Sequence, residues 1–592
     1  MKLDKNRMRS SWLALLALVT WSMPAFAQDI RTVAPKQPLP RQNAGMIKPP
    51  QSLSMPVSAS KSPLLAKLTG LRFVNSDQKI VRNGTRGAGI QTVFLPLMNS
   101  PRVKRRLSAF LGKPLFAEDL TKISNIVISW YRANNYPMVD VVFPEQDITT
   151  GIVQAIVIEY RLGKVNVKGN KYFSSRLLRS QIETKRGEAI NFSRLKTDLN
   201  KLNRSPFRTV NAVFGKSDVV GATDLTLETQ DRFPFSAYVG IDNLGIPITG
   251  RDRYSIGFSV GDPFGFDQQF SYAFITSPDL WRTRNNGAGL SNEPRFTAHS
   301  GAYLLPLGNG DAININGFYV SQVPNLGPDF GQVGHGLQFS FRYEMPLAIR
   351  GSLSQKLQFG FDYKRFDNNL AFGGTQIFSS RYKIAQLVVS YDATLVDRYG
   401  QTTVENQLVI SPGNLLPGNN SATFVASGVA QANARYLYDN IEVMRVTSLP
   451  WDASIVLRGK AQMATNELLP SEQLGAGGSD SVRGYDPRVA NGSQGIVTSV
   501  ELRSPIMTPL LDTLGVRDQG QLLAFWDYGK VSYLYSQTNL PKSAKLQSAG
   551  FGIRYTIGRN VDLRMDYGWQ LEKAPGAPKL GHLANIAVTL AY

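Results

Sequence analysis

The feature that most restricts the fold is an alternation of apolar and polar residues that recurs over the last 360 residues of the chain. In residues 561–569, VDLRMDYGW, every odd position is apolar, while the even positions are Asp, Arg, Asp and Gly. In residues 496–503, IVTSVELR, one face carries Ile, Thr, Val and Leu, and the other carries Val, Ser, Glu and Arg. Because successive side chains of a β-strand point to opposite faces, these segments are predicted to be strands with one apolar and one charged face.

Sixteen segments of this kind follow Phe233, near residues 235–246, 252–263, 267–277, 294–306, 312–322, 335–347, 353–368, 381–396, 400–411, 423–438, 451–464, 495–505, 521–535, 547–558, 561–572 and 584–592. Their spacing allows about 22 residues for each strand and its connection, and a membrane strand needs only ~9–11 of them in the bilayer. The even number and the two unlike faces predict a β-rich membrane protein. Residues 233–592 would form a 16-stranded transmembrane antiparallel β-barrel with a polar lumen wide enough to hold or pass another molecule.

The first 67 residues are predicted to contain no folded domain. Residues 1–27 have the pattern of a secretory signal peptide, with a basic start, an apolar stretch too short to span a membrane, and the ending Ala25-Phe26-Ala27. Residues 28–67 contain seven prolines and many Ser and Gln residues, a composition that cannot build a core. We therefore expect an extended linker or a short plug segment there.

Residues 68–232 change pattern, and two small mixed units are predicted. In the first, residues 68–161, a strand at 70–74 is followed by helices near 102–111 and 117–133 and by two strands, at 138–143 and 152–159. In the second, residues 162–232, a strand at 163–167 precedes helices near 174–182 and 192–202 and strands near 207–214 and 224–230. The shared order β-α-α-β-β indicates two similar modules.

The composition excludes several kinds of site. The chain has no cysteine, so disulfides, thiolate chemistry and cysteine-ligated metals are excluded, and its three histidines are isolated, which argues against a zinc centre. We expect no cofactor, no metal and no catalytic residue. The net charge of +21 is high, but Lys and Arg are spread through the chain, and the densest cluster, VKRR at 103–106, is typical of a solvated helix face. No nucleic-acid partner is expected.

Several stretches resemble a known family, the two-partner secretion transporters (TpsB, ShlB/FhaC/HecB type) of the superfamily that joins POTRA domains to a barrel. Residues 186–214, RGEAINFSRLKTDLNKLNRSPFRTVNAVF, resemble its second POTRA domain, and PEQDITTG at 144–151 resembles the end of the first. Residues 241–258, IDNLGIPITGRDRYSIGF, resemble the opening hairpin of its barrel. The resemblance therefore runs over most of the chain.

The most specific part of the resemblance is a pair of short motifs. The first is VRGY, formed by Val482, Arg483, Gly484 and Tyr485 in the long connection between the eleventh and twelfth predicted strands. The second is F-x-D-x-G, formed by Phe525, Asp527 and Gly529 on the thirteenth. In the family the first motif folds back into the lumen and its arginine pairs with the aspartate of the second. The resemblance thus implies that Arg483 anchors a loop on Asp527.

The resemblance also implies a function and a place. A transporter of this kind is expected in the outer membrane of a Gram-negative bacterium, with its POTRA domains in the periplasm. The implied partner is a cognate large β-rich exoprotein, such as an adhesin, haemolysin, toxin or haem-binding protein, captured unfolded and exported without nucleotide hydrolysis. Outer-membrane lipid, lipopolysaccharide and the barrel assembly machinery are further expected partners. One departure is the proline-rich segment, which leaves no proline-free window longer than eight residues between Ala34 and Pro63 for a plug helix.

Three other classes of protein remain as alternatives. An outer-membrane insertase would share the architecture, although insertases usually carry more than two POTRA domains. A diffusion porin would not need the two mixed units. A hydrolase is suggested only by GFSVG at 257–261, which matches G-x-S-x-G but lies within an alternating strand rather than at a strand-to-helix turn. We therefore expect no enzymatic activity.

Overall fold

The structure is a computed structural model that describes residues 46–48, 62–281, 293–327, 330–373, 375–508, 511, 515–537 and 540–592. The described chain divides into two compact units, one ending at Phe233 and the other beginning at Pro234. The predicted signal peptide, residues 1–27, and most of the predicted linker, residues 28–67, lie outside the described residues.

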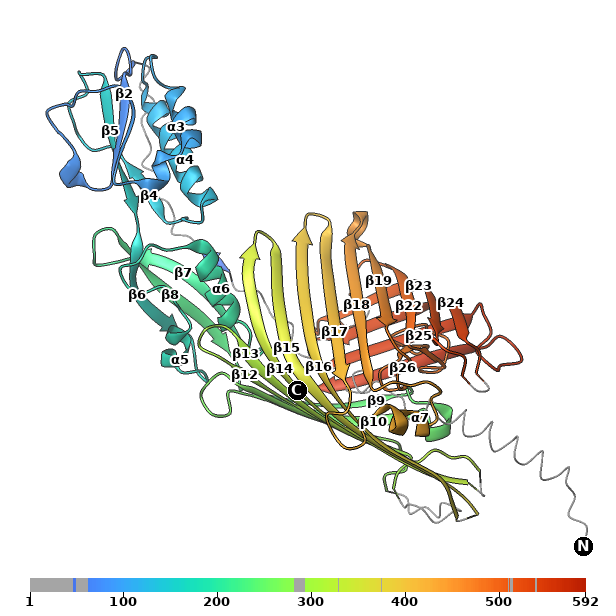
Figure 1. The fold of residues 1–592 in the computed structure, drawn as a ribbon. Helices are drawn as coiled ribbons and strands as arrows, with labels where there is room; N and C mark the ends of the chain where they lie inside the picture. Colours follow the sequence, from blue (N-terminus) through green and yellow to red (C-terminus); the bar gives the residue numbers. More distant parts are fainter. Residues whose placement is uncertain are drawn as a thin grey trace, which may run out of the picture. The chain divides into compact units, whose positions relative to one another are not determined.

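The first mixed module is a four-stranded sheet covered on one face by two helices (Figure 1). Its elements are β2 (Gly70–Val74), β3 (Gly89–Val93), α3 (Pro101–Ser108), α4 (Ala117–Ala133), β4 (Val139–Val142) and β5 (Ile152–Glu159), with sheet order β3-β2-β5-β4. Helix α4 buries Ile123, Val127 and Tyr131, which lie one above another at a spacing of four residues. The predicted order lacked β3, because all five residues of this strand are half-buried and show no apolar alternation.

The second mixed module has the same plan. It contains β6 (Arg161–Lys168), α5 (Ser175–Ser180), α6 (Phe192–Leu202), β7 (Arg208–Lys216) and β8 (Ala222–Asp231). The sheet order is β1-β7-β8-β6, in which β1 is the two-residue strand Ile47–Lys48, paired in parallel with Ala212 and Val213 of β7. Part of the segment predicted as a linker is therefore a strand at the edge of this sheet.

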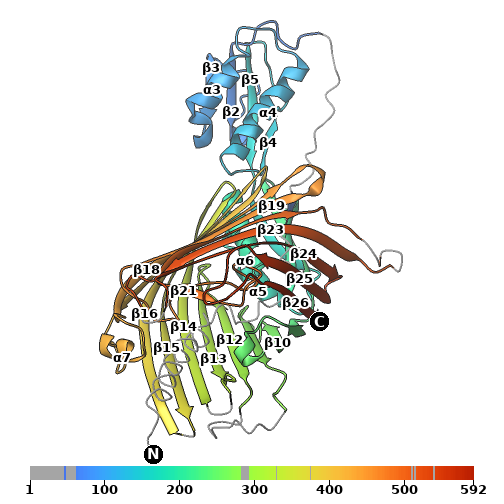
Figure 2. The same ribbon diagram turned by 90° about the vertical axis from the view of Figure 1, so that its right-hand side faces the viewer.

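Sixteen strands form a closed barrel (Figures 1 and 2). They are β9 (Phe235–Asp242), β10 (Arg253–Gly261), β11 (Gln269–Thr276), β12 (Phe296–Pro306), β13 (Ala312–Gln322), β14 (Phe330–Arg350), β15 (Leu353–Phe372), β16 (Thr375–Asp397), β17 (Gly400–Pro412), β18 (Arg435–Ser448), β19 (Ser454–Ala464), β22 (Gln494–Arg503), β23 (Asp518–Ser532), β24 (Ser543–Ile557), β25 (Val561–Gln570) and β26 (His582–Ala591). Neighbouring strands are antiparallel, and β26 closes the barrel on β9 over five residue pairs, against at least eight at every other neighbouring pair. The predicted 16-stranded barrel is confirmed.

One predicted strand was misplaced. The segment 423–438 is not a single strand, because helix α7 (Ser421–Ala426) occupies its first part and β18 begins only at Arg435. The side chain of Asn420 accepts a hydrogen bond from the backbone N–H of Thr423 (2.8 Å), which starts the helix, and Phe424 is fully buried beneath it. A local cap and one buried ring thus favour a helix at the start of the predicted strand, and only its last four residues, 435–438, are strand.

The two faces of the barrel strands differ as the alternation predicted. Outward-facing residues include the exposed apolar side chains of Leu387, Phe359 and Leu522, whereas lumen-facing residues include many buried polar and charged groups. The segment 257–261 that matched the hydrolase motif lies inside β10 and pairs with both β9 and β11, so it does not form a strand-to-helix turn. Over the ranges described, none of the helices has both the length and the apolar character needed to cross a membrane.

Candidate functional site

The candidate site is a long connection inside the barrel, residues 465–493, which we call the lumen loop. The loop leaves β19 and returns at β22, which are neighbours in the barrel wall. Within it, β20 (Leu474–Ala476) and β21 (Ala490–Gly492) pair with each other, and β21 is visible inside the barrel in Figure 2. This small hairpin holds the intervening residues in a fixed turn that projects toward the wall.

Arg483, predicted as the anchor of the loop, is 3% exposed and faces three carboxylates. Its Nε lies 2.8 Å from Asp527 Oδ2 and its Nη2 lies 2.7 Å from Asp527 Oδ1, so the guanidinium grips this carboxylate through two bonds. Its Nη1 donates to Glu501 Oε1 (2.8 Å) and lies 3.7 Å from Asp566 Oδ1. The backbone N–H of Arg483 also donates to Asp527 Oδ2 (3.0 Å). One loop residue is therefore bound to β22, β23 and β25 at once.

The other residues of the F-x-D-x-G motif shape the wall around Arg483. Phe525 lies on the same face of β23 as Asp527, and the guanidinium carbon of Arg483 stands 3.5 Å from the centre of its ring. At Gly529 a Cβ atom would come within 2.8 Å of Val482, so only glycine leaves room for that side chain. Each residue of the motif thus contacts the loop directly.

Gly484 and Tyr485 complete the contact of the VRGY motif with the wall. Gly484 has φ +86°, and a Cβ there would lie 2.9 Å from the carbonyl oxygen of Gly568 on β25. The hydroxyl of Tyr485 donates to the carbonyl of Glu572 (2.5 Å) and accepts from the N–H of Gln547 (3.3 Å). The structure therefore brings all seven predicted site residues together in one cluster.

A second cluster of contacts, not predicted from the sequence, fixes the loop to a different part of the wall. Glu472 is buried and accepts hydrogen bonds from Lys364 Nζ (2.7 Å), Gln386 Nε2 (3.1 Å) and the Tyr438 hydroxyl (2.9 Å). These partners lie on β15, β16 and β18. The only sequence signal was the alternation that places Lys364 on the lumen face of β15, because Glu472 belongs to no motif.

The loop makes two further polar contacts that matter for its position. The carboxylate of Glu467 accepts from the backbone N–H groups of Leu534 (2.9 Å) and Tyr535 (3.1 Å), just beyond β23. Asp486 forms an ion pair with Arg251, in the connection between β9 and β10. The lumen loop is thus held by wall strands from the start, the middle and the end of the barrel sequence.

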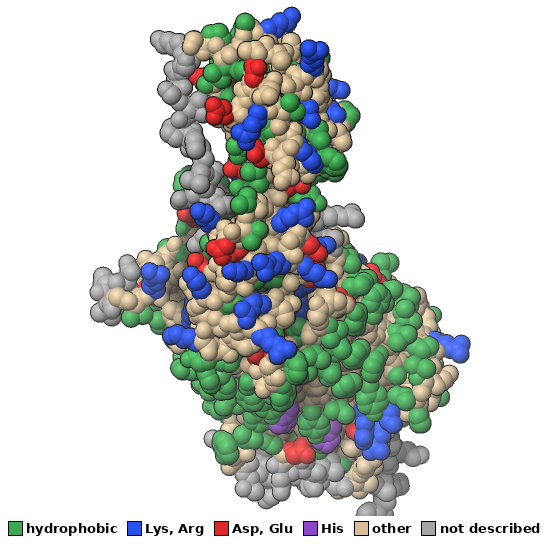
Figure 3. Space-filling view, turned by 90° about the vertical axis from the view of Figure 1, so that its left-hand side faces the viewer, with side chains coloured by type: hydrophobic (Ala, Val, Ile, Leu, Met, Phe, Trp, Pro, Cys, Tyr) green, Lys and Arg blue, Asp and Glu red, His purple; other side chains and the backbone are tan. Residues whose placement is uncertain are grey.

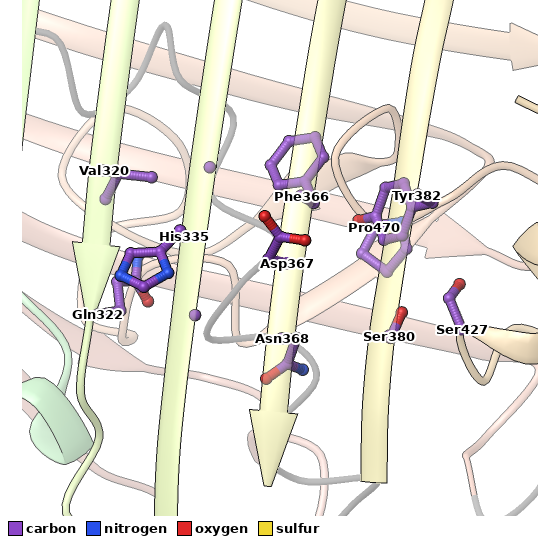
Figure 4. Close-up of a pocket in the computed structure, with 12 residues that line it drawn as sticks. Val320, Gln322, His335, Phe366, Asp367, Asn368, Ser380, Tyr382, Ser427 and Pro470 are labelled. Carbon is purple, nitrogen blue, oxygen red and sulfur yellow. The ribbon is translucent and has the colours of Figure 1, made fainter. Parts of the chain in front are cut away.

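The loop does not fill the lumen. A cavity of about 830 Å³ is lined by Arg483 and Asp480 of the loop and by charged wall residues such as Arg554, Arg564 and Asp562. A second cavity, of about 40 Å³, lies between the wall residues Phe366 and Tyr382 and Pro470 of the loop (Figure 4). The second cavity has room for little more than a water molecule. The first lies in the barrel interior, and many of its lining side chains are charged or polar.

Comparison with known proteins decides the family. The model of the family "Haemolysin secretion/activation protein ShlB/FhaC/HecB" matches residues 221–555, more than half of the chain. The chain belongs to this family. A ShlB-type POTRA domain model matches residues 89–159 of this transporter, and a further POTRA model, described as "Surface antigen variable number repeat", matches residues 160–228.

Curated relatives are transporters of the same type. The transporter is 23% identical over 466 residues to the heme/hemopexin transporter protein HuxB of Haemophilus influenzae, covering 76% of this chain and 77% of that protein. It is 24% identical over 410 residues to the outer membrane transporter CdiB of Dickeya dadantii, covering 67% and 68% of the two chains. The family is a class of transporters, and this chain is a two-partner secretion protein that exports through a 16-stranded outer-membrane barrel.

Solved structures support the fold. CdiB from Escherichia coli superposes with a TM-score of 0.70 at 18% identity, covering 97% of the transporter and 98% of that chain. CdiB from Acinetobacter baumannii gives 0.64 at 18% identity, with 96% and 99% covered. At this identity the likeness concerns the fold alone, namely POTRA domains joined to a closed barrel.

Proposed function

We propose that this transporter captures its cognate exoprotein unfolded with the two POTRA domains and passes it through the barrel without nucleotide hydrolysis. The observation that carries the proposal is the lumen lined by charged side chains, in which the loop is held by side-chain contacts and leaves a cavity of about 830 Å³. Folding of the client outside the cell would supply the driving force. Capture would take place at the open edges of the POTRA sheets.

Strand β7 supports the capture step, because apart from the two-residue strand β1 it forms the edge of its sheet. Its backbone pairs with the extended segment Ile47–Lys48, and the N–H of Ala212 donates to the carbonyl of Met46 (3.0 Å). An edge that accepts one extended segment through backbone bonds can accept others, because these bonds do not depend on side-chain identity. In the first POTRA domain, the outer strands β3 and β4 each pair on one side within the described sheet. A client rich in strand-forming segments fits these edges.

The test of capture is a chain that lacks residues 68–231 but still inserts as a barrel. We expect the amount of exoprotein in the culture supernatant to fall to background. The barrel in the membrane is quantified in the same cells as the control for insertion. Normal secretion by the truncated chain would show that the POTRA domains are spacers.

We further propose that the lumen loop acts as a latch whose anchor is Arg483 on Asp527. A guanidinium that faces three carboxylates is costly to pull from its site, because Asp527 would be left buried without its ion-pair partner. Glu501 and Asp566 would each keep a second cation, Arg503 and Arg554. Such a contact either keeps the barrel in shape or is broken when the client passes. Substitution of Arg483, described in the Discussion, tests this role.

The remaining assignments are part of the same proposal. The POTRA domains lie in the periplasm, the domain boundaries are 68–161, 162–232 and 233–592, and no step is enzymatic. The partners are one exoprotein, outer-membrane lipid including lipopolysaccharide, and the barrel assembly machinery. Deleting the gene of this transporter, and assaying the supernatant for a large, repetitive secreted protein encoded next to it, separates secretion from the alternative of barrel insertion. An insertase would leave the supernatant unchanged and reduce other barrels in the membrane.

A further inference from the structure

The outer face of the barrel changes from apolar to basic near one end of β15 and β16. Along β15 the outward-facing residues Leu357, Phe359, Phe361 and Tyr363 are followed by Arg365, and along β16 the outward-facing Val389, Leu387 and Ala385 are followed by Lys383 and Arg381. Figure 3 shows Lys and Arg side chains gathered beyond the hydrophobic surface of the barrel. This end of the barrel lies opposite the end where the chain enters β9 and leaves β26.

The cations of the two strands lie side by side. Arg365 pairs across the ladder with Lys383, and Asp367 pairs with Arg381. Residues directly opposite each other in an antiparallel pair have Cβ atoms about 4.5–5.5 Å apart. Three basic side chains therefore project from one small area of two adjacent strands.

Asp367 orients two of these side chains without neutralising the group. Its Oδ2 accepts from Arg365 Nε (3.0 Å), its Oδ1 accepts from Arg381 Nε, and its own side chain is only 16% exposed. The arginines remain accessible, with side chains 42% and 68% exposed. A largely buried carboxylate thus holds two exposed guanidinium groups next to each other on the outer face.

A fourth cation continues the group on β18. Arg435 is exposed, faces outward and pairs with Pro412 at the end of β17. Its nearest outward acid on β18 is Asp439, which accepts a hydrogen bond from Asn406 of β17 (2.8 Å). The group thus contains one carboxylate, Asp367, and four cations, namely Arg365, Arg381, Lys383 and Arg435. We call these four cations the outer basic patch.

We propose that the outer basic patch binds the phosphate groups of lipopolysaccharide in the outer leaflet of the membrane. The apolar side chains below the patch are suited to acyl chains, and the patch stands where the headgroups of that leaflet would lie. Guanidinium groups bind phosphate through parallel N–H···O bonds, and partly held arginines lose less freedom on binding. A lipid with several acyl chains and more than one phosphate satisfies both surfaces at once. The inference rests on the proposed orientation, with the POTRA domains in the periplasm.

The test uses the purified full chain in mixed micelles of a neutral detergent and phosphatidylcholine, titrated with diphosphoryl lipid A. Lipid A is expected to raise the temperature at which the barrel unfolds. Neutralising Arg365, Arg381 and Lys383 with glutamine should raise the half-saturating fraction of lipid A about a hundredfold, since each cation near a charged membrane surface contributes about a fivefold change. Dephosphorylated lipid A should give no shift.

A matched control changes three exposed arginines in separate turns at the opposite end, Arg398, Arg517 and Arg559, to glutamine. This control alters the net charge equally and should keep the wild-type titration. Because Asp367 loses its partners in the triple variant, a second variant, Lys383→Gln with Arg435→Gln, leaves that carboxylate paired and should shift the titration about twenty-five-fold.

Three results would overturn the proposal. They are an equal response to phosphatidylglycerol at the same charge, an unchanged titration in both patch variants, and an equal loss in the control variant. Secretion is measured separately in cells. Normal secretion with no lipid A response would reject the outer basic patch alone, whereas a lipid A response without secretion would reject the proposed export function alone.

Discussion

Buried charge is handled differently in the lumen loop and in the second POTRA domain. In the lumen, Arg483 meets Asp527, Glu501 and Asp566, and the donors of its guanidinium bond to carboxylate or hydroxyl oxygens. In the POTRA domain, Asp198 on α6 is fully buried, yet only one of its oxygens is hydrogen-bonded, by the N–H of Glu183 (3.0 Å). The other oxygen lies 3.6 Å from Lys201 Nζ.

The difference shows what each charge can do. A charge that is bonded on all sides stays ionised and fixes the elements around it. A carboxylate with one oxygen unbonded is easier to protonate, and burial accordingly raises the pKa of Asp198 to about 6, although the N–H of Glu183 and the nearby Lys201 oppose the shift. The loop cluster is therefore suited to hold position, whereas Asp198 changes its charge in mildly acidic solution.

The largest effect is expected from removing the loop anchor. Arg483→Ala leaves Asp527 and Glu501 buried without their common partner, which should cost about 3–5 kcal/mol of the free energy of unfolding and abolish or strongly reduce secretion. The measurement is the exoprotein in the supernatant together with the amount of folded barrel in the membrane.

Two further variants are needed to interpret the result for Arg483→Ala. Arg483→Asp combined with Asp527→Arg should restore part of the secretion, because the pair is re-formed in reverse. Arg559→Ala, in an exposed turn, is the matched control and should secrete normally. If Arg483→Ala secretes like the wild type, the loop is not a latch.

The next largest effect is a pH dependence of the free energy of unfolding that comes from Asp198. The folded domain holds the proton more tightly than the unfolded chain, in which the carboxyl keeps its ordinary pKa of 3.8. The free energy of unfolding should therefore fall by about 3 kcal/mol as the pH rises from well below 3.8 to above 6. Asp198→Asn should remove most of this fall. The measurement is urea unfolding of the full chain, followed through a spectroscopic signal of the second POTRA domain. An identical pH dependence in the variant would contradict the assignment.

A smaller effect is expected at the second contact of the loop. Glu472→Gln keeps the shape but removes the charge that faces Lys364, while Asp362 on the same strand still attracts that lysine. We expect a loss of about 2 kcal/mol and reduced, not abolished, secretion. The barrel's unfolding temperature measures the loss. A loss as large as that of Arg483→Ala would remove the distinction between the two contacts.

The smallest effect is expected at an exposed lysine. Lys122 on α4 donates to Asp119 (3.0 Å). Burial opposes ionisation of that carboxyl, but the bonds from Lys122 and from the backbone N–H of Phe116 lower its pKa overall. Lys122 is exposed, and Asp119 keeps its bond from the N–H of Phe116, so Lys122→Ala should leave secretion and unfolding within the scatter of replicate measurements. A clear loss of secretion would indicate that this helix face contacts the client.

The sequence predicted the parts of this structure that depend on periodicity or on a motif. Alternation located fifteen of the sixteen strands and their outward faces, and the motif pair placed Arg483 near Asp527. Periodicity did not predict β3, because the half-buried residues of that strand do not alternate. It also placed the start of β18 too early, because the short capped helix α7 precedes that strand. It also missed Glu472 with Lys364, since their contact joins positions 108 residues apart that carry no local pattern.

The five-pair join between β26 and β9 has a consequence for how the barrel bears force. The amide of Gln570, on β25, donates to the carbonyl of Gly484 (2.7 Å), and Asp486, two residues along the loop, binds Arg251 before β10. The loop therefore spans the join from inside, as a second support in parallel with the short ladder. A force that separates β26 from β9 therefore acts on the ladder and on the lumen loop together. The mechanical strength of the closed barrel then depends on its shortest ladder and on a loop that belongs to neither of the two strands.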